Sequence, residues 1–297
     1  NAYANQTHAD SVKGTAPTGG LAGTPDATGE KNTQGINTGL LPAWLSLSGK
    51  TRQNDLDVQW LISFQPNVSD QGGAVHGDSS TPLNRQAFFS FGDASWGSIK
   101  LGKDLGVFAS DAILNDMTLL GVGSGAGISG STANTTNGGI GTGYIYAAWK
   151  GQIAYTSPNW DGFQFTVAMT NPNQGFQSLG DGLTVNQDRM GYEGKASYSW
   201  TGDVSGKVWA SGATYDVQES TAANDYKVNV WDIGATVNVA GFGLTGYYYD
   251  GKGAGTTFLG NAGYDATVGK RRDSDGGYLQ ATYVIPTGTK LGVSYGI

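Results

Sequence analysis

The chain has 297 residues and a net charge of -7 at pH 7, with 49 glycines, 15 tyrosines, 8 tryptophans and no cysteine. The lack of cysteine excludes disulfide bonds and cysteine metal sites, and an acidic chain without a block of Lys or Arg argues against nucleic acid as a partner. No apolar run approaches the roughly 18 residues of a transmembrane helix, which excludes a helical membrane protein.

Strand signals with a period of two recur along the whole chain. In DLDVQWLISF, Leu56, Val58 and Trp60 share one face with two further apolar residues, whereas Asp57 and Gln59 lie on the other. Each such strand therefore has an apolar and a polar face. The same alternation is found, in chain order, in FQFTVAM, MGYEGKASYSW, VWDIGATVNV and LGVSYGI.

Two architectures explain this alternation. In a soluble sandwich the apolar faces meet in a core, whereas in an outer-membrane barrel they meet lipid and the polar faces line a wet lumen. Aromatic residues at strand ends favour the barrel, as do polar faces with few Lys and Glu and connections that alternate between very short and long. The sequence therefore predicts an all-β protein, a single antiparallel transmembrane β-barrel over residues 1–297.

The connections divide into two groups, which we expect at opposite rims of the barrel. We count about twelve strands. The short connections are predicted at 159–162, 201–203, 240–241 and 286–288. The long ones are predicted at 65–84, 104–146, 171–189, 217–227 and 251–276.

One segment departs from the strand pattern. The sequence IKLGKDLGVFASDAILNDM begins as a strand at Ile99 and then takes a helical pattern, with Ser110 as a possible N-cap and Asp111 in the first turn. Ile113 and Met117 are four residues apart and share one helix face. A short helical turn is therefore predicted inside an otherwise β-stranded chain.

Motifs around this segment resemble those of the general diffusion porins of Gram-negative outer membranes. NRQAFFSFGDASWGSIKLGKD is similar to an Arg-Gln-aromatic strand of that family, followed by a turn and a hydrophobic-Lys-Leu-Gly-Lys strand. GKDLGVFASDAILNDM resembles the family's third loop, and IAYTSPNWDGFQFTVAM resembles a strand-turn-strand unit. The motifs cover roughly residues 85 to 170.

The resemblance implies a barrel of sixteen strands, usually a homotrimer, with an inward-folded third loop that contains the short helical turn. This pore-constricting loop is expected at 104–146, with Ile113, Leu114 and Met117 on the inner wall and its carboxylates facing the water path. Family members begin with an earlier strand and end on an aromatic residue. We therefore expect that one strand at the start and about three at the end are missing from this sequence.

The resemblance also implies a charged pore constriction. Since Leu45, Leu47 and Leu101 face lipid, the basic wall is expected to comprise Lys50, Arg52 and Lys100, together with Arg85, which matches the family's wall arginine. The acidic loop opposite them would carry Asp116, which matches the family's loop aspartate, with Asp111 and Asp104 nearer the base. Such opposed charges would create a transverse field across the pore. The alternative is that these charges are solvated or pair across strands.

The expected function is passive diffusion of ions and small hydrophilic solutes through the outer membrane of a Gram-negative bacterium, with membrane lipid and lipopolysaccharide as further partners. No nucleophile-base set suggests an enzyme, and no cofactor is expected. Asp273–Gly277 is acidic and would form a rim loop, which could hold a calcium ion or could simply be solvated. The alternative function is that of a secreted or surface β-protein acting as an adhesin or carbohydrate binder.

Overall fold

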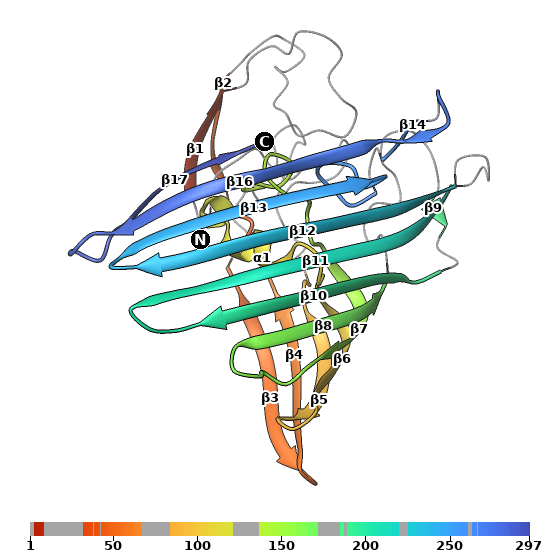
Figure 1. Cartoon of the computed structure of the whole chain (residues 1–297), viewed down its shortest axis with the longest axis vertical. Coiled ribbons are helices and arrows are strands. Elements are labelled where there is room, and N and C mark those ends of the chain that lie inside the picture. Colours follow the sequence, from red (N-terminus) through yellow and green to blue (C-terminus); the bar gives the residue numbers. More distant parts are fainter. Residues whose placement is uncertain are drawn as a thin grey trace.

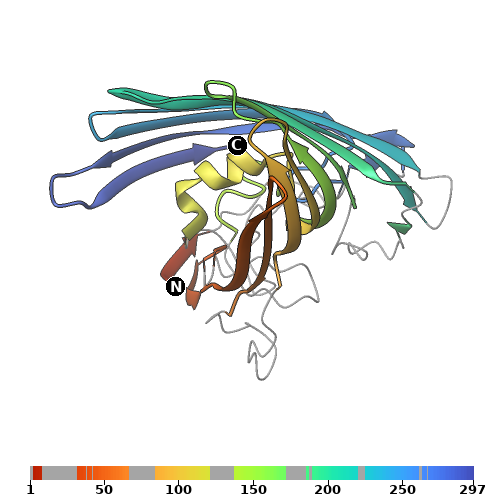
Figure 2. The same cartoon turned by 90° about the horizontal axis from the view of Figure 1, so that it is seen from below.

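The computed structural model describes residues 3–8, 32–37, 39–41, 43–66, 84–120, 137–171, 185–186, 189–219, 225–260, 263–265 and 267–297. Within these residues the chain forms one large curved antiparallel sheet, with a short helix on its concave side (Figures 1 and 2). The curvature gives the sheet an outer convex face and an inner concave face.

The main sheet is built from strands that pair mostly with their neighbours in the chain. Its path runs from β3 to β17, with β9 (Val185–Asn186) joined to β11 beside it. The strands on the path are β3 (Leu45–Gln53), β4 (Leu56–Phe64), β5 (Ala87–Asp93), β6 (Gly97–Leu105), β7 (Trp149–Thr156), β8 (Phe163–Thr170), β10 (Gly191–Trp200), β11 (Val204–Glu219), β12 (Tyr226–Val239), β13 (Phe242–Lys252), β16 (Asp273–Val284) and β17 (Lys290–Gly296).

Two small two-stranded sheets complete the β structure of the described residues. One pairs β1 (Tyr3–His8) with β2 (Asn32–Asn37), and the other pairs β14 (Tyr264–Asp265) with β15 (Lys270–Arg271). The helical elements are α1 (Ser110–Asn115) and the 3-10 helix η1 (Met117–Leu120).

The short connections lie where the sequence predicted them. The four predicted turns join β7 to β8, β10 to β11, β12 to β13 and β16 to β17. At the β3–β4 turn, Asn54 and Asp55 both have positive φ, of 49° and 61°, which is the backbone twist that two-residue hairpins require. Because consecutive strands are antiparallel, all of these turns share one rim of the sheet.

The long connections lie at the opposite rim, but two are shorter than predicted: the one expected at 217–227 comprises only 220–225, because β11 ends at Glu219 and β12 begins at Tyr226. β13 extends to Lys252 and β16 begins at Asp273, so the connection expected at 251–276 loses residues at both ends. Asp273–Gly277 consequently pairs with β13 as a strand, and the prediction that it forms a rim loop is wrong. The paired region ends at Lys252 and Asp273, which face each other in register.

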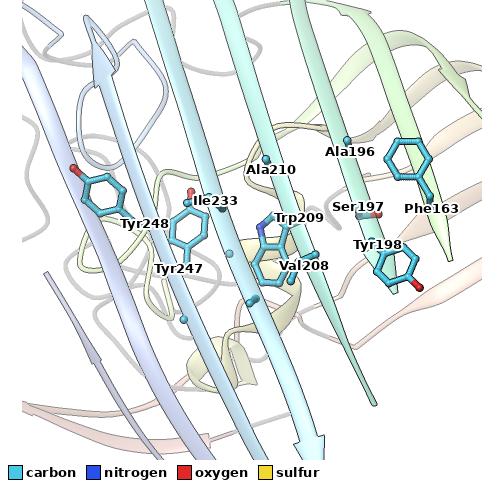
Figure 3. Close-up of a pocket in the computed structure, with 13 residues that line it drawn as sticks. Phe163, Ala196, Ser197, Tyr198, Val208, Trp209, Ala210, Ile233, Tyr247 and Tyr248 are labelled. Atoms are coloured by element: carbon cyan, nitrogen blue, oxygen red, sulfur yellow. The ribbon is translucent and has the colours of Figure 1, made fainter. Parts of the chain in front are cut away.

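The apolar strand faces point outward and are exposed, in agreement with the sequence pattern. Leu45 is 60%, Val167 50%, Ile233 53% and Leu291 56% exposed. Five neighbouring strands contribute to a shallow apolar hollow of about 580 Å³ on this face, bordered by Phe163, Tyr198, Val208, Ile233 and Tyr248 (Figure 3). In the part of the chain that the structure describes, no second sheet covers this surface, as a soluble sandwich would require.

The buried core lies on the concave side, between the sheet and α1. Phe108, Ala112 and Ile113 pack with aromatic side chains of β11, β13 and β16, which include Trp209 and Tyr278. Tyr247 and Tyr249 belong to this core and are 6% and 3% exposed, so of these three consecutive tyrosines only Tyr248 faces outward. The buried core therefore forms between the concave face and the segment that contains α1, and not between two sheets.

The twelve strands on the main path agree with the number expected from the sequence. Among the described strands the sheet is open, because β3 and β17 each have a single neighbour in it. The structure therefore establishes an antiparallel all-β fold with inner and outer faces.

We predict that Gly234→Ala destabilises the fold by about 1–3 kcal/mol through overpacking. A Cβ atom at Gly234 would lie 2.2 Å from Cζ2 of the buried Trp209. Gly194→Ala is the matched control, because its Cβ would find Thr166 O as its nearest neighbour at 3.9 Å. Urea unfolding in lipid vesicles, followed by tryptophan fluorescence, measures both; equal losses in the two variants would contradict this packing.

Candidate functional site: a loop bound across the concave face

The described residues of the segment between β6 and β7, 106–120 and 137–148, lie on the concave side of the sheet (Figure 2). The expected short helix is present as α1, with Asp111 in its first turn. Its N-cap differs from the prediction: Ala109 occupies that position with φ of 58°, and Ser110 instead donates its hydroxyl to Val107 O at 2.8 Å. The helix is short, so contacts with the sheet must hold it.

The first attachment is a buried carboxylate on β10. Glu193 accepts hydrogen bonds from the backbone N–H groups of Val107, at 2.5 Å, and Phe108, at 2.8 Å. Its carboxylate also forms an ion pair with Lys150 of β7 at 2.6 Å and accepts the Tyr215 hydroxyl of β11. The side chains of Lys150 and Glu193 are 2% and 0% exposed, so each charge depends on the other.

The second attachment pairs one carboxylate of α1 with two lysines of the sheet. Asp111 forms ion pairs with Lys195 of β10, at 2.8 Å, and with Lys207 of β11. Burial raises the pKa of Asp111, but the charge of Lys195 and the hydrogen bonds from both lysines lower it by more, so the pKa lies below its usual value. The cluster carries one excess positive charge.

The third attachment fixes the end of α1 to β16. Tyr278 donates its hydroxyl to Ala112 O at 2.8 Å. Gln280 bridges the helix end with both atoms of its amide, donating to Asn115 O at 2.9 Å and accepting from Met117 N at 2.7 Å. The loop is thus bound to strands on both sides of the concave face.

Asp116 joins the two arms of the loop to each other. It accepts hydrogen bonds from Thr118 N and Gly139 N, both at 2.8 Å, and from the Tyr144 hydroxyl at 2.7 Å. Asp111 and Asp116 are 6% and 7% exposed. We expected these carboxylates to face water, but the structure buries both of them. Each forms the hydrogen bonds or ion pairs that hold the loop in place.

The apolar side of the helix also differs in one residue. Ile113 is buried against the sheet, as predicted, but Leu114 is 61% exposed. Four consecutive residues, Ser110 to Ile113, are buried, and at about 100° per residue they cover most of the helix circumference. Leu114 consequently takes the remaining, exposed side of the helix.

Two of the expected wall residues pair within the sheet. Arg52 lies near the short-turn rim and forms ion pairs with Asp57, at 2.9 Å, and Asp93, at 2.8 Å. Lys100 forms an ion pair with Asp104, which the sequence placed on the opposing loop. Asp104 lies in β6 and also accepts the Gln86 amide at 2.9 Å, so it belongs to the wall and not to the loop.

Arg85 and Lys50 occupy different environments. Arg85 is buried, with its guanidinium 5.8 Å from the Trp149 ring centre, and donates to Leu40 O. Leu40 N in turn donates to Leu119 O at 3.0 Å, so Arg85 supports the end of the loop through this segment. Lys50 is exposed and lines a hollow of about 420 Å³ near the short turns.

Sequence reasoning missed the side chains that bind the loop most directly. Glu193 and Lys195 were placed on the polar face of their strand, which the structure confirms, but nothing in the local pattern marked them as partners of a distant helix. Nothing in the sequence around Lys150 or Lys207 marked them as part of the loop attachment. The alternation of apolar and polar residues predicts which face of a strand a side chain lies on. It does not predict the partners, which lie elsewhere in the chain.

A family model described as Gram-negative porin matches residues 2–297. The chain belongs to this porin family. No curated protein sequence matches it significantly. It is similar in fold to the anion-selective porin from Comamonas acidovorans, with 16% identity and a TM-score of 0.60 over 92% of this chain and 73% of that one.

Two further solved porins and channels have the same fold. The outer membrane channel DcaP of Acinetobacter baumannii matches with 14% identity and a TM-score of 0.63, over 99% of this chain and 78% of that one. OmpF of Salmonella typhi, solved with daunomycin, matches with 15% identity and a TM-score of 0.60, over 99% of this chain and 76% of that one.

This porin is therefore an outer-membrane protein that forms a channel for passive diffusion, as the sequence predicted. The family indicates a channel rather than an enzyme. No helix among the described residues is long and apolar enough to span a membrane. Those residues contain no group of three or more side chains placed to hold a metal ion, and a calcium ion at Asp273–Gly277 stays an untested prediction.

We predict that Glu193→Gln destabilises the folded porin by about 3 kcal/mol or more, because Lys150 is left buried without its counter-charge. The double variant Glu193→Gln, Lys150→Met removes both charges and should recover part of the loss. Urea unfolding in lipid vesicles measures the stability of each variant. A double variant less stable than Glu193→Gln alone would contradict a charge-dependent attachment.

We also predict that the attachment of α1 responds to pH only in strong acid. Because the folded pKa of Asp111 is depressed, its contribution is complete above the ordinary value of 3.8 and is lost as pH falls through the lower folded pKa. Protease cleavage of the loop should thus stay slow from neutral pH to about pH 4 and accelerate below it. Asp111→Asn should be cleaved faster throughout; loosening of the unsubstituted porin near neutral pH would overturn this assignment.

Proposed function

We propose that segment 106–148 forms the constriction of the porin channel. The observation that carries this proposal is the attachment of the segment across the concave face, from Glu193 and Lys195 on β10 to Gln280 on β16. A wide barrel leaves an aqueous channel unless something occupies it. A loop fixed at several strands narrows such a channel at a constant place.

We propose that the charges around this constriction act in interlocked groups. Asp111 with Lys195 and Lys207 leaves one excess positive charge beside α1, whereas Lys150 with Glu193 is neutral. Lys50 adds a further exposed cation on the wall. The field along the solute path is then set by Lys195 and Lys207 beside α1 and by Lys50 on the wall. Asp104, Asp111 and Asp116 act as positioning residues for their neighbours.

For the expected wall residues the proposal assigns separate roles. Lys50 and Lys100 border the solute path, since both lie on the inner face of their strands. Arg52, paired with Asp57 and Asp93, stiffens the exit at the short-turn rim. Arg85 holds the segment that supports the end of the loop.

The remaining parts of the proposal concern assembly in the membrane. We propose a closed barrel of sixteen strands, because unpaired backbone groups at the edges of β3 and β17 are costly in hydrocarbon. We further propose a homotrimer whose exposed apolar faces contact membrane lipid and lipopolysaccharide. The outward row of apolar residues, with aromatic side chains such as Tyr198 and Tyr248 among them, supports contact with lipid.

The test exploits the lack of cysteine in the chain. We predict that Leu114→Cys reacts with a bulky water-soluble thiol reagent and that the reaction lowers single-channel conductance in a planar bilayer, in three equal steps for a trimer. Ile113→Cys is the matched control, because Ile113 is 4% exposed where Leu114 is 61% exposed. Full labelling of Leu114→Cys without a change in conductance would show that the loop lies outside the solute path.

A further inference from the structure

A polar hollow lies at the short-turn rim of the sheet, between the ends of β3, β4, β5 and β6 and the β7–β8 turn (Figure 1). It has a volume of about 420 Å³, and none of the described residues that line it belongs to segment 106–148. Six of the lining side chains supply an ammonium, amides and hydroxyls, namely Lys50, Gln59, Ser90, Ser98, Asn159 and Gln164. The proposed constriction gives the amides and hydroxyls no role.

The register of the strands places this hollow on the inner face. Lys50 pairs with Gln59, and Gln59 pairs with Ser90, so these three side chains form one cross-strand row. Their chain neighbours Trp60 and Phe89 are 43% and 41% exposed and belong to the apolar outer face. Because side chains alternate along a strand, the row lies on the concave side.

The charges at the hollow balance one another. Arg52 forms ion pairs with Asp57, at 2.9 Å, and with Asp93, at 2.8 Å, and both carboxylates line the hollow. With the ammonium of Lys50, the group contains two cations and two carboxylates. Neither a small anion nor a small cation therefore meets an excess of opposite charge here.

The neutral polar groups keep hydrogen-bonding capacity for a solute. Among the residues that the structure describes, the side chains of Gln59, Ser90 and Ser98 form no hydrogen bond. Asn159 uses its side-chain oxygen, and Gln164 its side-chain nitrogen, in hydrogen bonds with the β7–β8 turn at 2.7 and 3.1 Å. The amide nitrogen of Asn159 and the amide oxygen of Gln164 remain for another partner.

The turns on two sides of the hollow are held by short contacts. Ser157 donates its hydroxyl to Pro158 O at 2.8 Å in the β7–β8 turn. In the β5–β6 turn, Ser95 N donates to Asp93 at 2.9 Å. The polar groups are thus positioned before a solute arrives, which lowers the entropic cost of binding one.

We propose that this hollow binds an uncharged, hydroxyl-rich solute, a mono- or disaccharide, during its passage through the channel. A hydroxyl both donates and accepts, so it pairs with the ammonium of Lys50, with amides and with other hydroxyls alike. The balanced charges favour such a neutral solute, and the volume lies in the range of about 300–1,000 Å³ of small-molecule sites. The site rests on the proposed solute path along the inner wall, and it adds a solute class to that path.

The experiment is a titration of the detergent-extracted porin with sucrose, read by saturation-transfer difference NMR. We expect saturable binding with a Kd on the order of 10 mM, since a few hydrogen bonds in a solvated site bind weakly. Ser90→Ala should weaken binding about threefold, and Ser90→Ala with Gln59→Leu about tenfold to thirtyfold. Ser48→Ala is the matched control and should leave binding unchanged, because Ser48 is exposed on the same face of β3 but does not line the hollow.

Three outcomes would overturn the site. One is equal binding of a polyethylene glycol of the same mass as sucrose, and another is an equal loss in Ser48→Ala and Ser90→Ala. The third is displacement of sucrose by an equal concentration of glycine, which would identify a site for a zwitterion.

Single-channel conductance of the same porin, with and without sucrose, separates this site from the proposed constriction. Sucrose bound in the hollow should lower the current in a saturable way, with the same dependence on Gln59 and Ser90. A conducting porin that binds no sucrose refutes the sugar site alone. The constriction is tested independently by labelling of Leu114→Cys, so failure of one proposal is recognised without the other.

Discussion

One constraint governs this molecule: every strand must present apolar side chains to one side and polar side chains to the other. Because side chains alternate along a strand, a single register fixes both faces at once. The outer face is thereby committed to aliphatic and aromatic residues such as Val167 and Ile233, and the inner face carries the charged and hydrogen-bonding groups together with the side chains that pack against α1. All other features of this porin use the polar surface that the constraint creates.

That inner surface acts as a docking surface for a segment with little structure of its own. The helix α1 has six residues, too few to be stable alone, and each of its ends is bound by the sheet. Glu193 binds the backbone just before the N-terminus of α1, and Gln280 binds its C-terminal residue. Because Glu193 and Lys150 are buried together, the loop is tied to a pair of charges that are costly to separate.

The distribution of charge follows from this attachment. A carboxylate that binds the loop cannot also face the solute, so Asp111 and Asp116 contribute position and not an exposed acidic surface. The exposed contact that α1 offers to the space beside it is apolar, from Leu114. In the proposed constriction, the channel is narrowed by a segment whose carboxylates are already paired, and the lysines around it carry the excess charge.

The sequence by itself determined the strands, their faces, the alternation of turns and loops, and the short helix, because these depend on residues near one another in the chain. It did not determine the partners of the charged residues. Ser110 and Lys195 are 85 residues apart, and Ala112 and Tyr278 are 166 residues apart, so only the curvature and register of the whole sheet bring them together. The same holds for Asp104, which sequence reasoning placed on the loop and which pairing along β6 and with Gln86 assigns to the wall. Local alternation fixes the direction of a side chain, whereas its partner is decided by the tertiary structure, because ion pairs and hydrogen bonds require contact in space.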